Sequence, residues 1–182
     1  MKRLIVMFAI GMLMVAGAQA LAKQPPAELQ KLDIATGHWI FHGKSMGAAS
    51  GEAGSWTWDA DCRWSADKLY LLCLFHNTWS GQSVKSLVVD TWNSHDKSYW
   101  HYEMFSAGTS GKHPFSSRMS IKGNTWVEYG QSKDHGKKIR TRIVYVYSSS
   151  SRVHVEIQVS KDGKHWKTVD SGEGVKEIGK KA

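Results

Sequence analysis

The histidines and carboxylates of this 182-residue chain suggest few places where chemistry could occur. His38 and His42 lie four residues apart, so on an extended strand about 13 Å separates their Cα atoms, too far for one metal ion. His101 and Glu103 share one face of a predicted strand. His101 or His76 becomes a candidate haem ligand only if its face turns inward, and we expect both to be ordinary surface or core residues.

The known catalytic motifs are missing from the chain. It has no Cys-x-x-Cys, no His-Glu-x-x-His, no Gly-x-Ser-x-Gly nucleophile elbow and no glycine-rich phosphate loop before a helix. The sequence therefore predicts no catalytic residue, no metal ligand and no cofactor. An enzyme that uses none of these motifs remains an open alternative.

Tryptophan is the unusual component, with nine residues, all after position 20. Seven aromatic side chains can point to one side of the predicted strands and are the candidate ligand-binding residues: Trp39, Phe41, Trp56, Trp58, Trp64, Phe75 and Trp79. Such rings either fill the interior of a small barrel or line a pocket for a small apolar ligand. The sequence leaves both possibilities open.

The first twenty residues have the plan of a secretory signal peptide. Lys2 and Arg3 precede an apolar run from Leu4 to Val15, and small residues then lead to an Ala18-x-Ala20 cleavage pattern. A retained membrane anchor is less favoured, because the run is far shorter than the roughly 20 residues of a membrane span. We expect a signal peptide over residues 1–20 and a periplasmic or secreted mature chain without a membrane span.

The mature chain, residues 21–182, has the length of a single domain. Loss of Lys2 and Arg3 lowers the formal net charge from +8 to +6. The basic residues are dispersed except around Lys138 to Arg142, which we interpret as a solvated face. We therefore expect no nucleic-acid partner, whereas an interaction module that uses this basic strand stays an alternative.

The chain changes from a helical to a β pattern near Gly37. Residues 25–32 are predicted as a short helix, and the pattern then has period two. We predict ten strands: 38–44, 55–64, 69–79, 84–92, 99–106, 115–122, 125–130, 138–147, 152–160 and 165–169, the last with a possible extension through 175.

Ten short strands joined by turns, without helical crossovers, indicate an antiparallel meander. Closing the meander removes its exposed edges, so we predict an all-β, antiparallel up-and-down barrel with a short N-terminal helix. A two-sheet sandwich is the alternative.

The second and third strands have a predictable register. A turn centred on Asp67 and Lys68 makes the numbers of opposed residues add up to 135. Cys62 then faces Cys73, and cross-strand neighbours are close enough for a disulfide after a small adjustment. We predict this disulfide, because paired cysteines in an exported protein favour one.

The same register sets Asp59 opposite His76 on the outer face. The two could form half of an acid–base site. We favour an exposed ion pair instead, which is the ordinary outcome for opposite charges on neighbouring strands.

Four loose motifs together resemble a known family. They are Leu29-x-x-Leu32 before Gly37-x-Trp39, the segment from Val88 to Asn93, the segment from Tyr99 to Gly108, and Ser160-x-Asp162-Gly163-x-x-Trp166. In these the mature chain resembles an uncharacterised bacterial domain-of-unknown-function family with a lipocalin-like (calycin) barrel. The resemblance implies the fold and a place for Trp39 at the closed end, and it implies no activity.

The chain is more distantly similar to nitrobindins, whose ten-stranded barrels bind haem through a histidine near the C-terminus. The segment from Gly37 to Gly43 departs from their closer-spaced glycines, and no histidine here matches theirs. We therefore predict an exported barrel that binds a small apolar or amphipathic ligand in an aromatic lumen. A haem-binding barrel remains an alternative, and the oligomeric state is left open.

Overall fold

The computed structural model describes residues 25–47, 53–79, 81–106, 115–134, 137–177 and 179. The expected signal peptide, Met1 to Ala20, lies outside the described residues. A 3-10 helix, η1 (Ala27–Ala35), precedes ten strands. The strands are β1 (Gly37–Ser45), β2 (Gly54–Trp64), β3 (Leu71–Trp79), β4 (Gln82–Asn93), β5 (Ser98–Phe105), β6 (Phe115–Lys122), β7 (Thr125–Asp134), β8 (Lys137–Ser149), β9 (Arg152–Ser160) and β10 (Lys167–Glu177).

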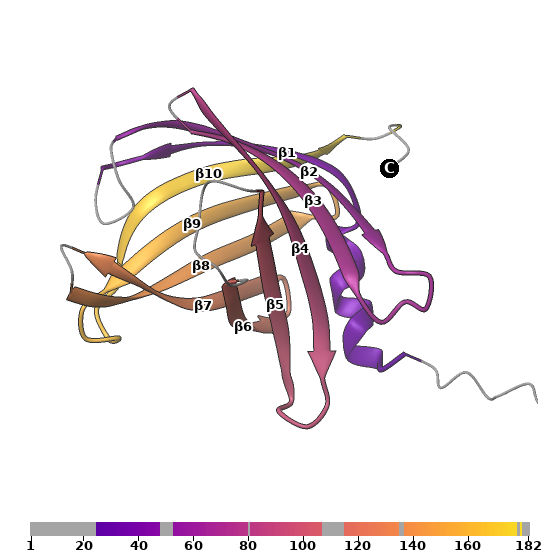
Figure 1. The fold of residues 1–182 in the computed structure, drawn as a ribbon. Helices are drawn as coiled ribbons and strands as arrows, with labels where there is room; N and C mark the ends of the chain where they lie inside the picture. The colour runs from indigo at the N-terminus through magenta and orange to yellow at the C-terminus, as the bar shows by residue number, and fades with distance from the viewer. Residues whose placement is uncertain are drawn as a thin grey trace, which may run out of the picture.

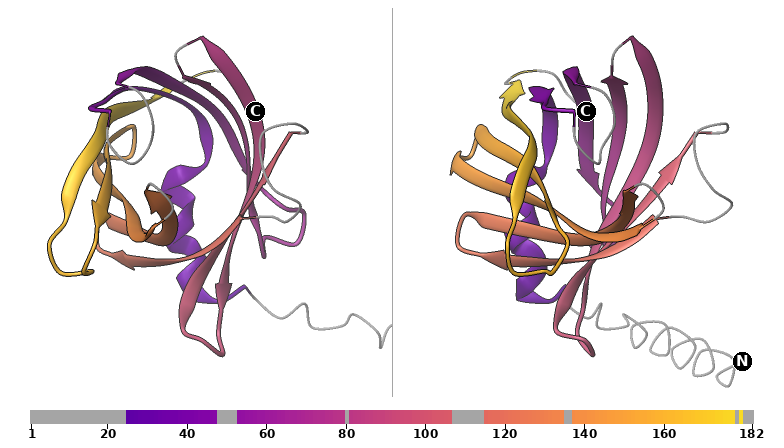
Figure 2. Two further views of the ribbon diagram at one scale, coloured as in Figure 1. Left: turned by 60° about the vertical axis from the view of Figure 1, so that its left-hand side comes forward. Right: turned by 90° about the vertical axis from the view of Figure 1, so that its left-hand side faces the viewer.

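The strands form one closed antiparallel barrel in which each pairs with its neighbours in sequence and β1 pairs with β10 (Figure 1). The predicted up-and-down barrel is confirmed, and the sandwich alternative is excluded. In the left view of Figure 2 the strands form a ring, with η1 inside its outline. Within the described part of the chain, no helix has the length and apolar character needed to cross a membrane.

Helix η1 covers one end of the barrel, which we call the closed end. Trp39 is 2% exposed there, and its indole Nε1 donates a hydrogen bond of 2.9 Å to the carbonyl oxygen of Ala35. Trp64 donates to the carboxylate of Asp33, and the Tyr99 hydroxyl donates to the carbonyl oxygen of Glu28. These bonds hold the helix to three different strands.

Glycines in β1 and β10 make room for two large rings inside the barrel. A Cβ atom added to Gly43 or Gly172 would lie within 2.5 Å of the Trp56 ring, and one on Gly174 would lie 2.4 Å from Phe41. The rings lie directly on the backbone at positions where no other residue type would leave space for them. Trp56 and Phe41 are accordingly buried at 2% and 7% exposure.

The register predicted for β2 and β3 is correct at every pair, including Trp56 with Trp79 and Cys62 with Cys73. The disulfide is present, with the two Cα atoms 4.0 Å apart. Strand β3 begins at Leu71 rather than at the predicted 69, because the preceding residues form a turn. In that turn the backbone N–H of residue 69 donates to the Asp67 carboxylate.

The expected ion pair between Asp59 and His76 is wrong, although the two residues do oppose each other. The His76 ring instead hydrogen-bonds the Ser83 hydroxyl at 2.5 Å. Asp59 lies 3.6 Å from Nδ1 of His38 on the other neighbouring strand. Each side chain therefore finds its partner on a different neighbour.

Candidate functional site: the barrel lumen

The described residues border two adjacent cavities in the barrel interior. The wide cavity, about 590 Å³, is bordered by Trp79, Phe105 and Phe115, which lie at strand ends away from η1. The deep cavity, about 60 Å³, lies toward the closed end beside Ala35 and Trp39. The two cavities share five lining residues: Phe75, Val88, His101, Glu128 and Tyr145.

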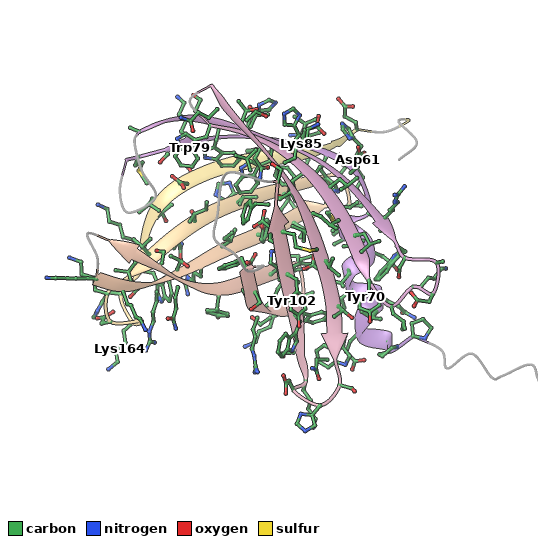
Figure 3. All side chains as sticks on the ribbon, in the orientation of Figure 1. Asp61, Tyr70, Trp79, Lys85, Tyr102 and Lys164 are labelled. Atoms are coloured by element: carbon green, nitrogen blue, oxygen red, sulfur yellow. A yellow bond between two sulfur atoms is a disulfide. The ribbon has the colours of Figure 1, made fainter. Side chains whose placement is uncertain are left out.

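Five of the seven predicted lumen residues border these cavities. Trp39 and Phe41 line the deep cavity, Trp58 and Trp79 line the wide one, and Phe75 lines both. Figure 3 shows Trp79 at the end of β3 that lies farther from η1.

The other two predicted residues, Trp56 and Trp64, border neither cavity. Trp56 stacks on Trp58 with ring centroids 4.3 Å apart and fills the space over the glycines of β1 and β10. Trp64 donates its hydrogen bond of 2.7 Å to Asp33 beneath the helix. Trp56 thus stiffens the wall behind Trp58, and Trp64 fastens the helix.

Four ionisable side chains also line the lumen: Asp90, His101, Glu103 and Glu128. We call them the lumen acid cluster. They come from β4, β5 and β7, so the sequence separation within the cluster reaches 38 residues. Asp90 and Glu128 are only 7% and 5% exposed.

His101 occupies the centre of this cluster. Its Nδ1 lies 2.8 Å from Asp90 Oδ1, and its Nε2 lies 3.6 Å from Glu128 Oε1. Burial lowers the pKa of His101, but its hydrogen bond to Asp90 and the charges of the surrounding carboxylates outweigh this effect and raise that pKa to about 9. The imidazole is therefore a cation at neutral pH and donates to Asp90.

The two glutamates of the cluster each accept a hydrogen bond from a serine. Ser86 donates to Glu103 at 2.7 Å, and Ser117 donates to Glu128 at 2.8 Å. Burial nevertheless raises the pKa of both carboxyl groups above the usual value, because these bonds and the charge of His101 offset only part of the lost hydration. Each glutamate thus has a strong tendency to gain a proton or a cation.

Asn77 adds an unsatisfied acceptor to the same cavity. It lines the wide cavity, and its side-chain oxygen Oδ1 is buried without a hydrogen-bond partner. Buried polar atoms are normally satisfied, so this oxygen is a place where a guest molecule or water would bind favourably.

Sequence reasoning placed His101 and Glu103 on one face but assigned no role to them. Both faces of β5 mix aromatic and polar residues, since Tyr99 and Phe105 share the inner face with His101 and Glu103 while Trp100 and Met104 point outward. Alternation alone shows which residues share a face and not which face is inside. Asp90 and Glu128 belong to no recognised functional motif, so the sequence did not identify them as site residues.

A second group of ionisable residues lies on the outer wall. One potential ligand atom from each of His38, Asp59 and Asp61 lies within 4.8 Å of the others, a spacing that could hold a metal ion. Nδ1 of His38 is 2.9 Å from Asp61, and its Nε2 is 3.5 Å from Glu177. The hydrogen bond between His38 and Asp61 accounts for the arrangement without a metal.

The basic strand singled out from the sequence is β8, and Lys138 and Arg140 are exposed on it. Arg142 is already engaged, because its Nε donates to Gln158 at 2.6 Å and its guanidinium carbon lies 4.2 Å from the centre of the Trp166 ring. Arg140 and Trp166 border an outer groove of about 750 Å³. Part of the predicted basic face is therefore used in internal contacts.

Comparison with known proteins supports the fold only. No known protein family and no curated protein matches the chain. Among solved structures, the chain is similar to the crystal structure of Rv2717c from M. tuberculosis, with a TM-score of 0.53 and 8% sequence identity. The match covers 84% of this chain and 99% of that chain.

Proposed function

We propose that this protein is an exported binding protein that holds a small amphipathic molecule in its barrel lumen. The observation that carries this proposal is the wide cavity of about 590 Å³, whose wall combines aromatic rings with carboxylates. Its volume falls within the range of roughly 300–1,000 Å³ that is usual for small-molecule sites. A guest with an apolar body and a polar group would contact both kinds of side chain.

Export is part of the proposal and rests on the signal-peptide pattern of residues 1–20. The Cys62–Cys73 disulfide is compatible with it, since disulfides persist in oxidising compartments outside the cytoplasm. Membership of the lipocalin-like family of unknown function likewise remains a proposal, based on the resemblance of the four sequence motifs.

Haem binding is less favoured than an organic guest. Among the described residues, His101 is the histidine that borders the two cavities. Its Nδ1 is bonded to Asp90, and its raised pKa keeps Nε2 protonated at neutral pH. Metal ligation needs a neutral imidazole, so an iron ion would have to displace a stabilised proton.

Fluorescence titration with the neutral apolar probe N-phenyl-1-naphthylamine tests the proposal. We expect saturable binding that is weakened at least fivefold by Trp79→Ala, because this ring lines the wide cavity. Trp100→Ala is the matched control, since Trp100 lies on the outer wall against Arg118. Absence of binding, or equal loss in both variants, would contradict a lumen site. Native mass spectrometry of protein from its own compartment would then identify the natural guest.

A further inference from the structure

We infer that the guest of the lumen is an organic cation, a protonated amine on an apolar body, whose ammonium group is bound by Glu103, Glu128 and the amide oxygen of Asn77. This inference rests on the proposed function and adds the chemical class of the ligand. It follows from the charge, the hydrogen bonding and the aromatic walls of the same cavity.

The lumen acid cluster has more negative than positive groups. Asp90, Glu103 and Glu128 stand against the single imidazolium of His101. Tyr145 lines both cavities and stays neutral, because burial raises the pKa of its hydroxyl. With its carboxyl groups ionised, the interior therefore has a charge of minus two.

Among the described residues, the cation that forms ion pairs with this cluster is His101. Arg142 also borders the wide cavity, but its guanidinium lies over the ring of Trp166, which borders the outer groove, and no ion pair joins it to the lumen carboxylates in the described part of the chain. Buried charge without a partner is costly, so the empty lumen takes up protons and the occupied lumen favours a cation.

The hydrogen bonds of the lumen carboxylates also favour a cationic guest. Ser86, Ser117 and His101 have each donated to one carboxylate. A carboxylate accepts several hydrogen bonds, so the glutamates keep free acceptor capacity. Together with the unpartnered Oδ1 of Asn77, the wall presents acceptors to a guest, and an ammonium group supplies only donors.

The aromatic wall suits the rest of such a molecule. Trp58, Phe75 and Trp79 border the wide cavity. Trp58 is held in place by Trp56, at 4.3 Å, and by Phe41, whose ring centroid is 5.8 Å away. Aromatic faces attract cations within about 6 Å, and they also bury apolar surface well. Both parts of the proposed guest thus find matching surfaces.

A metal ion fits the lumen less well than an organic cation. Within the described part of the chain, His38, Asp59 and Asp61 on the outer wall are the group whose ligand atoms converge within 4.8 Å. The carboxylates of the lumen acid cluster do not converge on a point in this way, so they are better spaced for a larger, diffuse charge.

The inference is tested with three ligands that share a naphthylethyl body and differ in its terminal group. They are 2-(1-naphthyl)ethylamine, which is a cation, 2-(1-naphthyl)ethanol, which is neutral, and 3-(1-naphthyl)propionate, which is an anion. Calorimetric titration at pH 7 should give an affinity for the amine at least tenfold higher than for the alcohol, with the propionate weakest. Equal or tighter binding of the alcohol or the propionate would overturn the inference.

Glutamine variants test whether Glu103 and Glu128 bind the ammonium group. Glu103→Gln and Glu128→Gln should each weaken amine binding at least fivefold and leave alcohol binding unchanged, whereas Glu173→Gln, an exposed outer-wall control, should alter neither. An amine affinity unaffected by both lumen variants would also overturn the inference.

The same titrations separate a failure of this inference from a failure of the proposed function. If 2-(1-naphthyl)ethanol and N-phenyl-1-naphthylamine bind and Trp79→Ala weakens their binding, but 2-(1-naphthyl)ethylamine binds no more tightly, only the cation inference fails. If none of these molecules binds, the proposed function fails with it.

Discussion

Asp90 and His101 face each other across β4 and β5 inside the barrel, with Oδ1 of Asp90 2.8 Å from Nδ1 of His101. The two residues are direct cross-strand partners, so the register of one hairpin sets their distance. The hydrogen bond orients the imidazole so that Nε2 points to Glu128 on β7. One strand pairing therefore organises the charged wall of the lumen.

The protonation state of His101 follows from this arrangement. Burial lowers its pKa, but Asp90 on β4, Glu128 on β7 and Glu103 on its own strand outweigh this and raise the pKa to about 9; the neighbouring Tyr145 hydroxyl on β8 is neutral, because burial raises its own pKa. We expect NMR titration to show the imidazolium persisting well above the ordinary value of 6.5. Because the folded pKa is the higher one, the stabilisation is complete below pH 6.5 and is lost as the pH rises through about 9.

Asp90→Asn should lower this pKa markedly, because the amide keeps the shape of the carboxylate and removes its charge. Asp96→Asn is the matched control, since Asp96 pairs with the exposed His95 outside the lumen and should leave His101 unchanged. An imidazole that titrates at or below pH 6.5 in the parent protein would show that the carboxylates do not act on it.

Glu103→Gln should stabilise the protein at pH 8 although it weakens binding of a cation. Burial raises the pKa of Glu103, so its carboxylate costs stability at pH values above the folded pKa. Glutamine can still accept the hydrogen bond from Ser86. The melting temperature of the variant should exceed that of the parent at pH 8, and the difference should shrink as the pH falls to 4. A lower melting temperature at pH 8 would contradict this account.

Removal of the disulfide should lower stability without changing the fold. Cys62 and Cys73 are 11 residues apart, and in the chain-entropy model a loop of this size contributes on the order of 3 kcal/mol. The double serine variant should melt several degrees lower, with the same β circular dichroism spectrum. If the double serine variant and the oxidised parent protein have the same melting temperature, the disulfide does not contribute this stability.

Trp39→Ala should be among the most damaging single substitutions. Trp39 is 2% exposed, touches Phe41 and Tyr147, and is bonded to Ala35 of η1. Loss of burial together with a cavity should cost roughly 3–5 kcal/mol in denaturant unfolding. Trp100→Ala, on the outer wall, should cost clearly less. Near-normal stability of the Trp39 variant would show that the closed end does not depend on this ring.

The sequence alone determined the local features of this protein. Period-two alternation identified the ten strands, and the turn at Asp67 and Lys68 gave the register that joins Cys62 to Cys73. These features depend on residues close together in the chain, where turn length and side-chain alternation leave little freedom. The N-terminal helix followed from the same kind of local pattern, whereas the place of Trp39 at the closed end was implied by the family resemblance.

Only the tertiary structure decided which residues form the charged wall. Glu128 reaches His101 because β6 pairs with β5 on one side and with β7 on the other, and the inward curvature of the sheet brings the two side chains together across β6. Closure also determined that His101 and Glu103 face inward while Trp100 and Met104 on the same strand face outward. Alternation pairs residues by face, but the choice of the inner face depends on how the whole sheet curves, and on β5 both faces carry aromatic residues.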